Sequence, residues 1–163
     1  MALGFFNANT TTPRLARLRT LSLFVELSPA ELAVVDALMH ERDYLPGEVI
    51  FDQGEEGQAV YIVLDGEVTI RRHEPAKAGE VDELARLTVG TFFGELALLD
   101  SAPRMAQAQA VTACKLAVFF RDDFLGLLDT HGRIASKIAR QLARHIGRRL
   151  RELAIAVGAH QHL

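Results

Sequence analysis

The sequence predicts an α+β fold that is mainly β: an antiparallel jelly roll with helices before it and a long helix after it. Two observations carry this prediction. From Tyr44 to Phe120 the apolar residues recur with a period of about 2, and turn residues arrive roughly every eight to ten positions, as in sheets of short antiparallel strands. Before and after this region the apolar period returns to about 3.6, which indicates amphipathic helices.

Size and composition limit the class of protein. The chain has 163 residues, of which 49% are hydrophobic and 24% charged, and this supports one domain of ordinary size. A formal net charge of -3 is too mild to indicate nucleic acid or acidic lipid as the general partner. The sequence shows no signal peptide and no apolar window that could span a membrane, and its single Cys114 cannot form an internal disulfide. We therefore expect a reduced, cytoplasmic protein.

The N-terminal region is expected to be helical after a polar lead. Residues 1–13 are predicted to be flexible, residues 14–158 to form a single domain, and residues 159–163 to form a tail. Leucines recur at three-residue intervals from Leu15, as on one face of a helix. Ser28 and Glu31 have the spacing of a capping box, with Pro29 at the first helical position, which predicts a helix from Pro29 to about His40.

The roll itself is expected over about residues 44–120. Asp65 and Gly66 separate two strand patterns and predict a hairpin turn, because both residue types tolerate a positive φ. The other glycines between strands, such as Gly57, are interpreted as turn formers only. The expected strands are 48–52, 59–64, 67–72, 81–88, 106–110 and 114–120. C-terminal helices are expected over residues 122–157: a short one over 122–128 and a long one from Arg133 that ends at Gly158.

Residues 90–110 interrupt the strand pattern and carry the candidate chemistry. Gly94 allows the backbone to approach a ligand closely, and residues 95–99 can form one short helical turn with unpaired N–H groups at its start. Arg104 adds a charged, bidentate donor for a phosphate. The carboxylate of Glu95 would repel a phosphate, so it is better explained as the acceptor for a sugar hydroxyl on the same ligand.

This stretch resembles the phosphate-binding cassette of the cyclic nucleotide-binding domain family, which includes the catabolite activator protein, the regulatory subunits of cyclic AMP-dependent kinase and cyclic nucleotide-gated channels. Residues 46–70, with their PGE, QGE and GEV triplets, resemble the first half of the family's β-roll, and residues 23–32 resemble its helical lead-in. The similarity covers about residues 23–150. It implies a stand-alone cyclic nucleotide-binding domain.

The resemblance also implies a ligand and the residues that bind it. Glu95 falls where the family binds the ribose 2'-OH, and Arg104 falls on the arginine that binds the cyclic phosphate. Met105 departs from the usual Ala, Ser or Thr, of which Thr is associated with cyclic GMP. Since Met has no hydroxyl, cyclic AMP is the expected ligand and cyclic GMP the alternative. The implied binding residues are Phe93, Gly94, Glu95, Leu96, Ala97, Arg104, Met105 and Ala106.

The last predicted helix carries two stripes. The basic one consists of Arg133, Lys137, Arg140, Arg144, Arg148 and Arg151; the apolar one consists of Ile134, Ile138, Leu142, Ile146, Leu150 and Leu153. In the family this helix covers the base, and an ungapped count suggests His145, Arg149 and Leu150 as the base lid. We interpret the basic stripe as a solvated helix face rather than a nucleic-acid site, because no recognition helix follows it. The apolar stripe is explained either by packing within the molecule or by a homodimer seam.

The function expected from these features is a non-enzymatic cyclic AMP sensor that signals to an unidentified protein effector by rearranging its last helix. One alternative is a degenerate module for ligand-independent interaction or dimerisation, in which Glu95 and Arg104 form a structural ion pair. Another is a fragment of a transcription regulator or a channel. A metal enzyme is disfavoured because the histidines are scattered, and no nucleophile elbow supports hydrolysis. We expect no metal and no cofactor besides the nucleotide.

Overall fold

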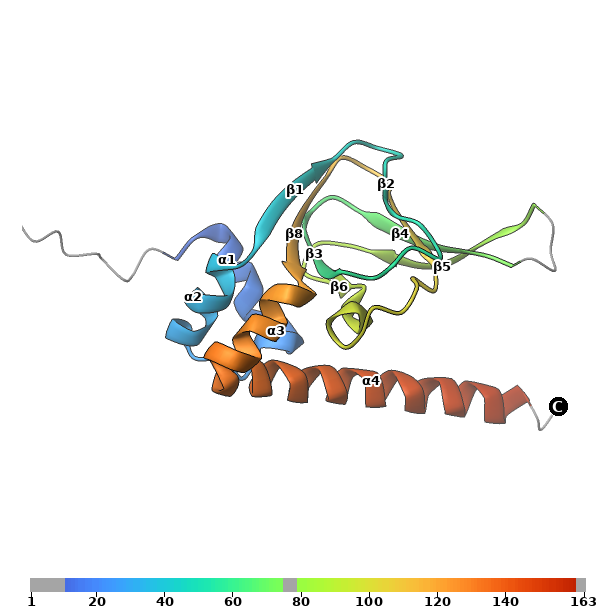
Figure 1. The fold of residues 1–163 in the computed structure, drawn as a ribbon. Helices are drawn as coiled ribbons and strands as arrows, with labels where there is room; N and C mark the ends of the chain where they lie inside the picture. The colour runs from blue at the N-terminus through green and yellow to red at the C-terminus, as the bar shows by residue number, and fades with distance from the viewer. Residues whose placement is uncertain (1–10, 75–78, 161–163) are drawn as a thin grey trace, which may run out of the picture.

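A computed structural model describes residues 11–74 and 79–160 (Figure 1). The predicted mainly β architecture is confirmed: the described residues form two four-stranded antiparallel sheets with helices at both ends of the chain. Each of the expected strands is present, with its ends shifted by no more than one residue. The strands are β1 (His40–Tyr44), β2 (Val49–Phe51), β3 (Ala59–Asp65), β4 (Val68–His73), β5 (Val81–Leu87), β6 (Phe92–Phe93), β7 (Gln107–Ala110) and β8 (Cys114–Phe120).

The two sheets face each other across an apolar interior. One has the strand order β1-β8-β3-β6 and the other β2-β7-β4-β5. The central strand β3 is buried on both of its faces, which explains its continuous apolar run. Tyr61 and Val63 point into the roll with the buried side chains of both sheets, whereas Val60 and Ile62 belong to a second cluster formed with the helices.

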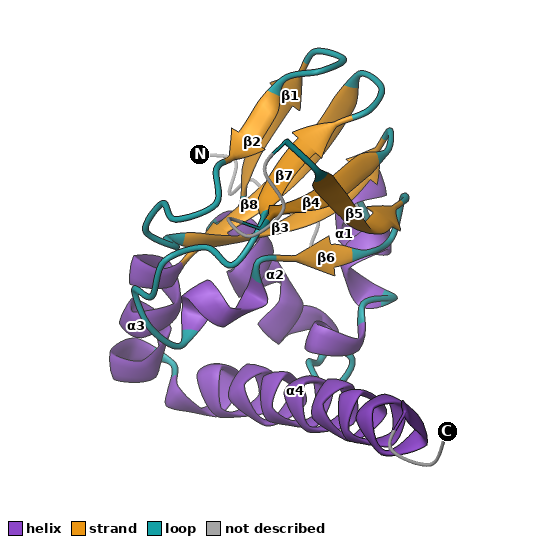
Figure 2. Ribbon diagram, turned by 90° about the vertical axis from the view of Figure 1, so that its right-hand side faces the viewer, coloured by secondary structure: helices purple, strands orange, loops and turns teal. Residues whose placement is uncertain are grey.

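The helices form a layer on the outer face of the first sheet, and Figure 2 shows α2, α3 and α4 below the strands. They are α1 (Pro13–Arg19), the short 3-10 helix η1 (Ser22–Phe24), α2 (Pro29–Ala37), α3 (Arg121–Thr130) and α4 (Gly132–His160). Ile138 and Leu142 of α4 are fully buried against Phe24 of η1. The predicted capping box of α2 is present: the Glu31 amide donates to Ser28 Oγ at 3.2 Å, and the Ser28 amide donates to Glu31 Oε2 at 2.8 Å.

The hairpin predicted at Asp65 and Gly66 is wrong. The strands on either side, β3 and β4, lie in different sheets and do not pair, so this turn carries the chain from one sheet to the other. Of the two turn residues, only Gly66 takes a positive φ, of 87°. A Cβ at this position would collide with the carbonyl oxygen of Ala113, so the crossing requires glycine.

Several predicted boundaries also differ. The roll begins at His40 rather than Tyr44, because residues 40–44 pair with β8, and the helix expected to reach His40 ends at Ala37. The two-residue strand β6 was too short to give a periodic signal. The start of α3 at Arg121 and of α4 at Gly132 each lie one residue before the expected position.

The helices α1 and α4 extend into the two ends that were expected to lie outside the domain. Thr12 caps α1 and Pro13 is its first residue, so the helix begins before residue 14. Residues 1–10 lie outside the described residues. The long helix does not end at Gly158, since this glycine does not adopt the left-handed conformation that would stop it. The helix runs to His160, and residues 161–163 of the expected tail lie outside the described residues.

Candidate functional site

The predicted site lies where β6 ends and a short 3-10 helix, η2 (Glu95–Leu98), begins. Gly94 precedes this helix with a φ of 72°, in the left-handed region that favours glycine. A Cβ at Gly94 would stand 2.7 Å from Nη1 of Arg104. The close approach of these two residues therefore depends on the absence of a side chain at position 94.

Arg104 is held by main-chain carbonyl groups and by an aromatic ring. Its Nη1 donates to the Gly94 carbonyl at 3.0 Å and its Nη2 donates to the Ala59 carbonyl at 2.8 Å. The guanidinium carbon lies 4.1 Å from the ring centroid of Phe51, which gives a cation–π contact. These contacts fix the guanidinium at the rim of the roll, at the end of β3 that begins with Ala59.

The charge of Arg104 has no ion-pair partner among the carboxylates of the described residues. Its Nε is buried and has no hydrogen-bond partner in this part of the chain. Burial lowers the pKa of Arg104 from its usual value, because a charged group loses hydration there. A half-buried guanidinium with an unused donor is a site suited to an anion.

Glu95, the first residue of η2, is buried although it is a carboxylate, with 5% of its surface exposed. Its Oε1 lies 3.2 Å from Nη1 of Arg149 and 3.4 Å from Nε2 of His145, both on α4. The His145 ring also contacts Phe92 of β6, with 5.0 Å between the ring centroids. These contacts dock the middle of α4 against η2, and Figure 1 shows α4 passing beside this turn.

The other predicted residues divide by exposure. Phe93 and Ala97 are buried, and Ala106 is half-buried; Leu96 and Met105 are exposed, Met105 by 74%. Of the predicted base lid, His145 and Arg149 reach Glu95, whereas Leu150 is 65% exposed. The structure thus brings Gly94, Glu95 and Arg104 together with His145 and Arg149.

Sequence reasoning missed the contribution of the segment between β2 and β3. The main-chain carbonyl of Glu55 accepts a hydrogen bond from the Arg104 amide at 2.7 Å, and the Gly54 amide donates to the Arg104 carbonyl at 2.8 Å. Gly57 is more than the turn former that was expected, since a Cβ there would lie 3.0 Å from Cβ of Ala97. The only signal for this role was the spacing of the glycines in the QGE region.

The first half of the basic stripe of α4 is exposed at Arg140 and Arg144, as expected of a solvated face, and it also forms ion pairs with the helical lead-in. Lys137 pairs with Glu31 at 2.7 Å, and Arg144 pairs with Glu26 at 2.8 Å. Arg140 also contacts Glu26, at 3.3 Å. This part of the stripe therefore attaches α4 to the helical lead-in.

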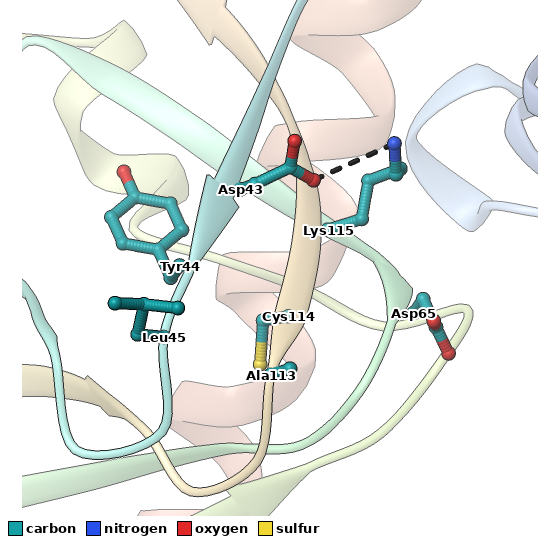
Figure 3. A pocket seen from close by; sticks show the side chains of 7 residues that line it. All are labelled: Asp43, Tyr44, Leu45, Asp65, Ala113, Cys114 and Lys115. Atoms are coloured by element: carbon teal, nitrogen blue, oxygen red, sulfur yellow. Dashed lines mark ion pairs between the residues drawn. The ribbon is translucent and has the colours of Figure 1, made fainter.

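A pocket lies at the other end of β3 and β8, away from Arg104 (Figure 3). Figure 3 shows an ion pair at its edge, in which Lys115 Nζ lies 3.5 Å from Asp43 Oδ1. The lining consists of Asp43, Tyr44, Leu45, Asp65, Ala113, Cys114 and Lys115. None of these residues belongs to the predicted site, so we assign no ligand to the pocket.

In residues 11–74 and 79–160, no group of three or more His, Cys, Asp or Glu side chains is arranged to hold a metal ion. None of the helices described combines the length and apolar character that a membrane span requires.

The sequence is similar to those of known cyclic nucleotide-binding proteins. The sequence model of the cyclic nucleotide-binding domain matches residues 41–131. A cyclic AMP receptor protein from Thermus thermophilus is 39% identical over 130 residues, which cover 80% of this chain and 57% of that protein. A cAMP-dependent protein kinase regulatory subunit from Mycosarcoma maydis is 38% identical over 91 residues, which cover 56% of this chain and 17% of that protein.

The solved structures agree. The crystal structure of the Thermus thermophilus catabolite activator protein superposes with a TM-score of 0.77 and 36% identity, and the match covers 86% of this chain and 63% of that one. The chain thus spans little more than half the length of its receptor-protein relative and a small part of the kinase subunit. The family model covers more than half of the residues and the predicted fold is present, so this chain belongs to the cyclic nucleotide-binding domain family.

Proposed function

We propose that this protein is a cyclic AMP sensor that binds its ligand at Arg104 and Glu95 and catalyses no reaction. The observation that carries the proposal is the guanidinium of Arg104, which is half-buried, has an unused Nε donor and has no carboxylate partner among the described residues. A cyclic phosphate would supply the missing negative charge through a bidentate contact. The matched family and the cyclic AMP receptor among the relatives support this ligand class.

The other residues of the site have supporting roles in this proposal. Gly94, Leu96 and Ala97 line the phosphate at the start of η2, with Phe93 and Ala106 beneath and beside them. Glu95 accepts the ribose hydroxyl. Met105 is exposed and offers no hydroxyl to a guanine, which favours cyclic AMP over cyclic GMP.

The signal would pass through Glu95 to α4. Both α4 contacts, from Arg149 and His145, are made to this one carboxylate. A sugar hydroxyl that bonds to the carboxylate would therefore share or replace the groups that dock α4. Ligand would then favour one position of α4 over another, and a protein effector would read that position.

A second candidate function, dimerisation through α4, is favoured by the far half of this helix. Leu150, Leu153 and Val157 follow one helix face and are each more than half exposed. If this face is a seam between two copies, Leu150→Glu should convert a dimer to a monomer in light scattering. A wild-type protein that is monomeric at high concentration would reject this second function and leave the sensor proposal intact.

Calorimetric titration with cyclic AMP and cyclic GMP tests the main proposal. We expect micromolar or tighter binding of cyclic AMP, and a loss of about 10- to 150-fold in Arg104→Ala, which removes hydrogen bonds to a charged group worth about 1.5–3 kcal/mol. Arg86→Ala is the matched control, because Arg86 pairs with Glu83 and Glu67 on the second sheet and should leave affinity unchanged. Absence of binding by the wild type would reject the sensor and favour the degenerate module.

A further inference from the structure

Residues 52–58, which join β2 to β3, are hydrogen-bonded to the main chain around Arg104. We refer to this segment as the strap. Three hydrogen bonds join the two main chains. The Arg104 amide donates to the Glu55 carbonyl at 2.7 Å, the Gly54 amide to the Arg104 carbonyl at 2.8 Å, and the Gly57 amide to the Ala102 carbonyl at 3.3 Å. An antiparallel bridge between Glu56 and Pro103 continues this pairing. Arg104 lies before β7, which begins at Gln107, so the strap and not the sheet holds its main chain.

On its other side the strap is attached to the start of α3 by one arginine. Arg121 Nη1 donates to the Gly57 carbonyl at 3.2 Å, and Arg121 Nη2 donates to Glu56 Oε1 at 3.4 Å. The Arg121 amide also donates to the Gln58 carbonyl at 2.8 Å. The Arg121 side chain is only 17% exposed, whereas its partner Glu56 is 56% exposed.

The helix that Arg121 opens is packed on the helix that docks at Glu95. Phe124 and Leu127 of α3 are buried in the same cluster as Ile134 and Ile138 of α4. A continuous set of contacts thus runs from α4 through α3 and Arg121 to the strap, and from the strap to Arg104.

Building on the proposed function, we propose that Arg121 is a positioning residue for cyclic nucleotide binding: it fixes the strap, and the strap fixes Arg104. Its side-chain hydrogen bonds go to Gly57 and Glu56, and not to Glu95 or Arg104. Arginine suits this role because its planar group offers two donors in fixed directions, one for a carbonyl and one for a carboxylate, whereas lysine carries a single nitrogen. The helices and the anion site would then move as coupled parts.

Amide hydrogen exchange in the ligand-free protein tests the structural half of this proposal. In Arg121→Ala we expect at least tenfold faster exchange at the amides of Gly54 and Arg104, with little change at the β4–β5 ladder. Arg121→Lys should give a smaller rise, since it keeps the positive charge and one donor nitrogen. Unchanged exchange at these two amides would overturn the proposal, and so would an equal rise throughout both sheets, which would indicate general destabilisation.

Cyclic AMP affinity tests the functional half. We expect Arg121→Ala to weaken binding about three- to tenfold, and to have no further effect when Arg104 is already alanine, because the strap acts through that side chain. Additive losses in the double variant would overturn the coupling. If Arg121→Ala does not fold, Glu56→Gln removes the carboxylate contact alone and should shift both readouts in the same direction, and its failure to shift either would also overturn the proposal.

The two halves fail separately. If the wild type binds no cyclic AMP, the proposed function is rejected and the positioning role in binding falls with it, yet exchange at Gly54 and Arg104 still decides whether Arg121 fixes the strap. Arg86→Ala serves again as the control, because its ion pairs, with Glu83 of β5 and with Glu67 in the turn before β4, involve no residue of the strap.

Discussion

Replacing Gly94 by alanine tests the geometry of the site through stability. The substitution imposes a left-handed conformation on a residue with a Cβ, which costs about 1–2 kcal/mol. The new Cβ would also stand 2.7 Å from Nη1 of Arg104, so the guanidinium must move and lose its bond to the Gly94 carbonyl. A hydrogen bond to a charged group contributes about 1.5–3 kcal/mol. We expect a total loss of about 2.5–5 kcal/mol in the free energy of unfolding.

Gly47→Ala is the matched control for this loss. Gly47 has a similar φ of 83°, but a Cβ there would meet nothing within 4 Å, so only the conformational cost of about 1–2 kcal/mol remains. Urea denaturation of both variants should give a difference of about 1.5–3 kcal/mol, or roughly 3–12 °C in melting temperature for a chain of this size. Equal losses would show that Arg104 accommodates the methyl group, and would refute the argument that this glycine is required by the arginine.

Three other substitutions test separate features of the site and its helix. Arg149→Ala should change stability by less than about 1 kcal/mol, because Arg149 is 64% exposed, but should speed proteolytic cleavage in the far half of α4 by freeing it from Glu95. Lys137 holds the pKa of Glu31 below its usual value, so this pair contributes stability above the unfolded pKa of about 4.3 that is lost as the pH falls through the lower, folded pKa. The stability gap between wild type and Lys137→Ala should therefore narrow from pH 7 to pH 3 in denaturant titrations, and a constant gap would contradict the pairing. Met105→Thr should raise the affinity for cyclic GMP relative to cyclic AMP by about tenfold, the value of one added hydrogen bond, in paired calorimetric titrations.

Local signals in the sequence predicted much of the fold correctly. The strands follow from their period, and the start of α2 follows from Ser28 and Glu31, which lie three residues apart and make their contacts within the same turn. Contacts of this kind depend on the chain nearby and hardly on the rest of the molecule. The turn at Gly66 was misassigned because its geometry depends on which sheet each neighbouring strand joins, and that pairing is decided by distant residues.

The site was predicted in part for the same reason. Glu95 and Arg104 lie within one short stretch whose motif could be identified, and the structure places them beside Gly94. The attachment of Glu95 to α4 joins residues that are 54 positions apart, and counting along the chain could not reveal which part of the ligand site the helix would reach. The link from Arg121 to Glu56 spans 65 positions and had no signal in the sequence.

The two-sided burial of β3 leaves this strand a single workable alignment. Neighbouring residues alternate between two dissimilar compartments, since Tyr61 faces the aromatic interior with Phe51 and Phe93, while Ile62 faces the helices. A slip of one residue would exchange every side chain between them and would drive the phenol ring of Tyr61 into the closely filled helical layer. One strand register therefore places both the Tyr61 ring, which lies under the Arg104 guanidinium, and Ile62, against which the helices pack.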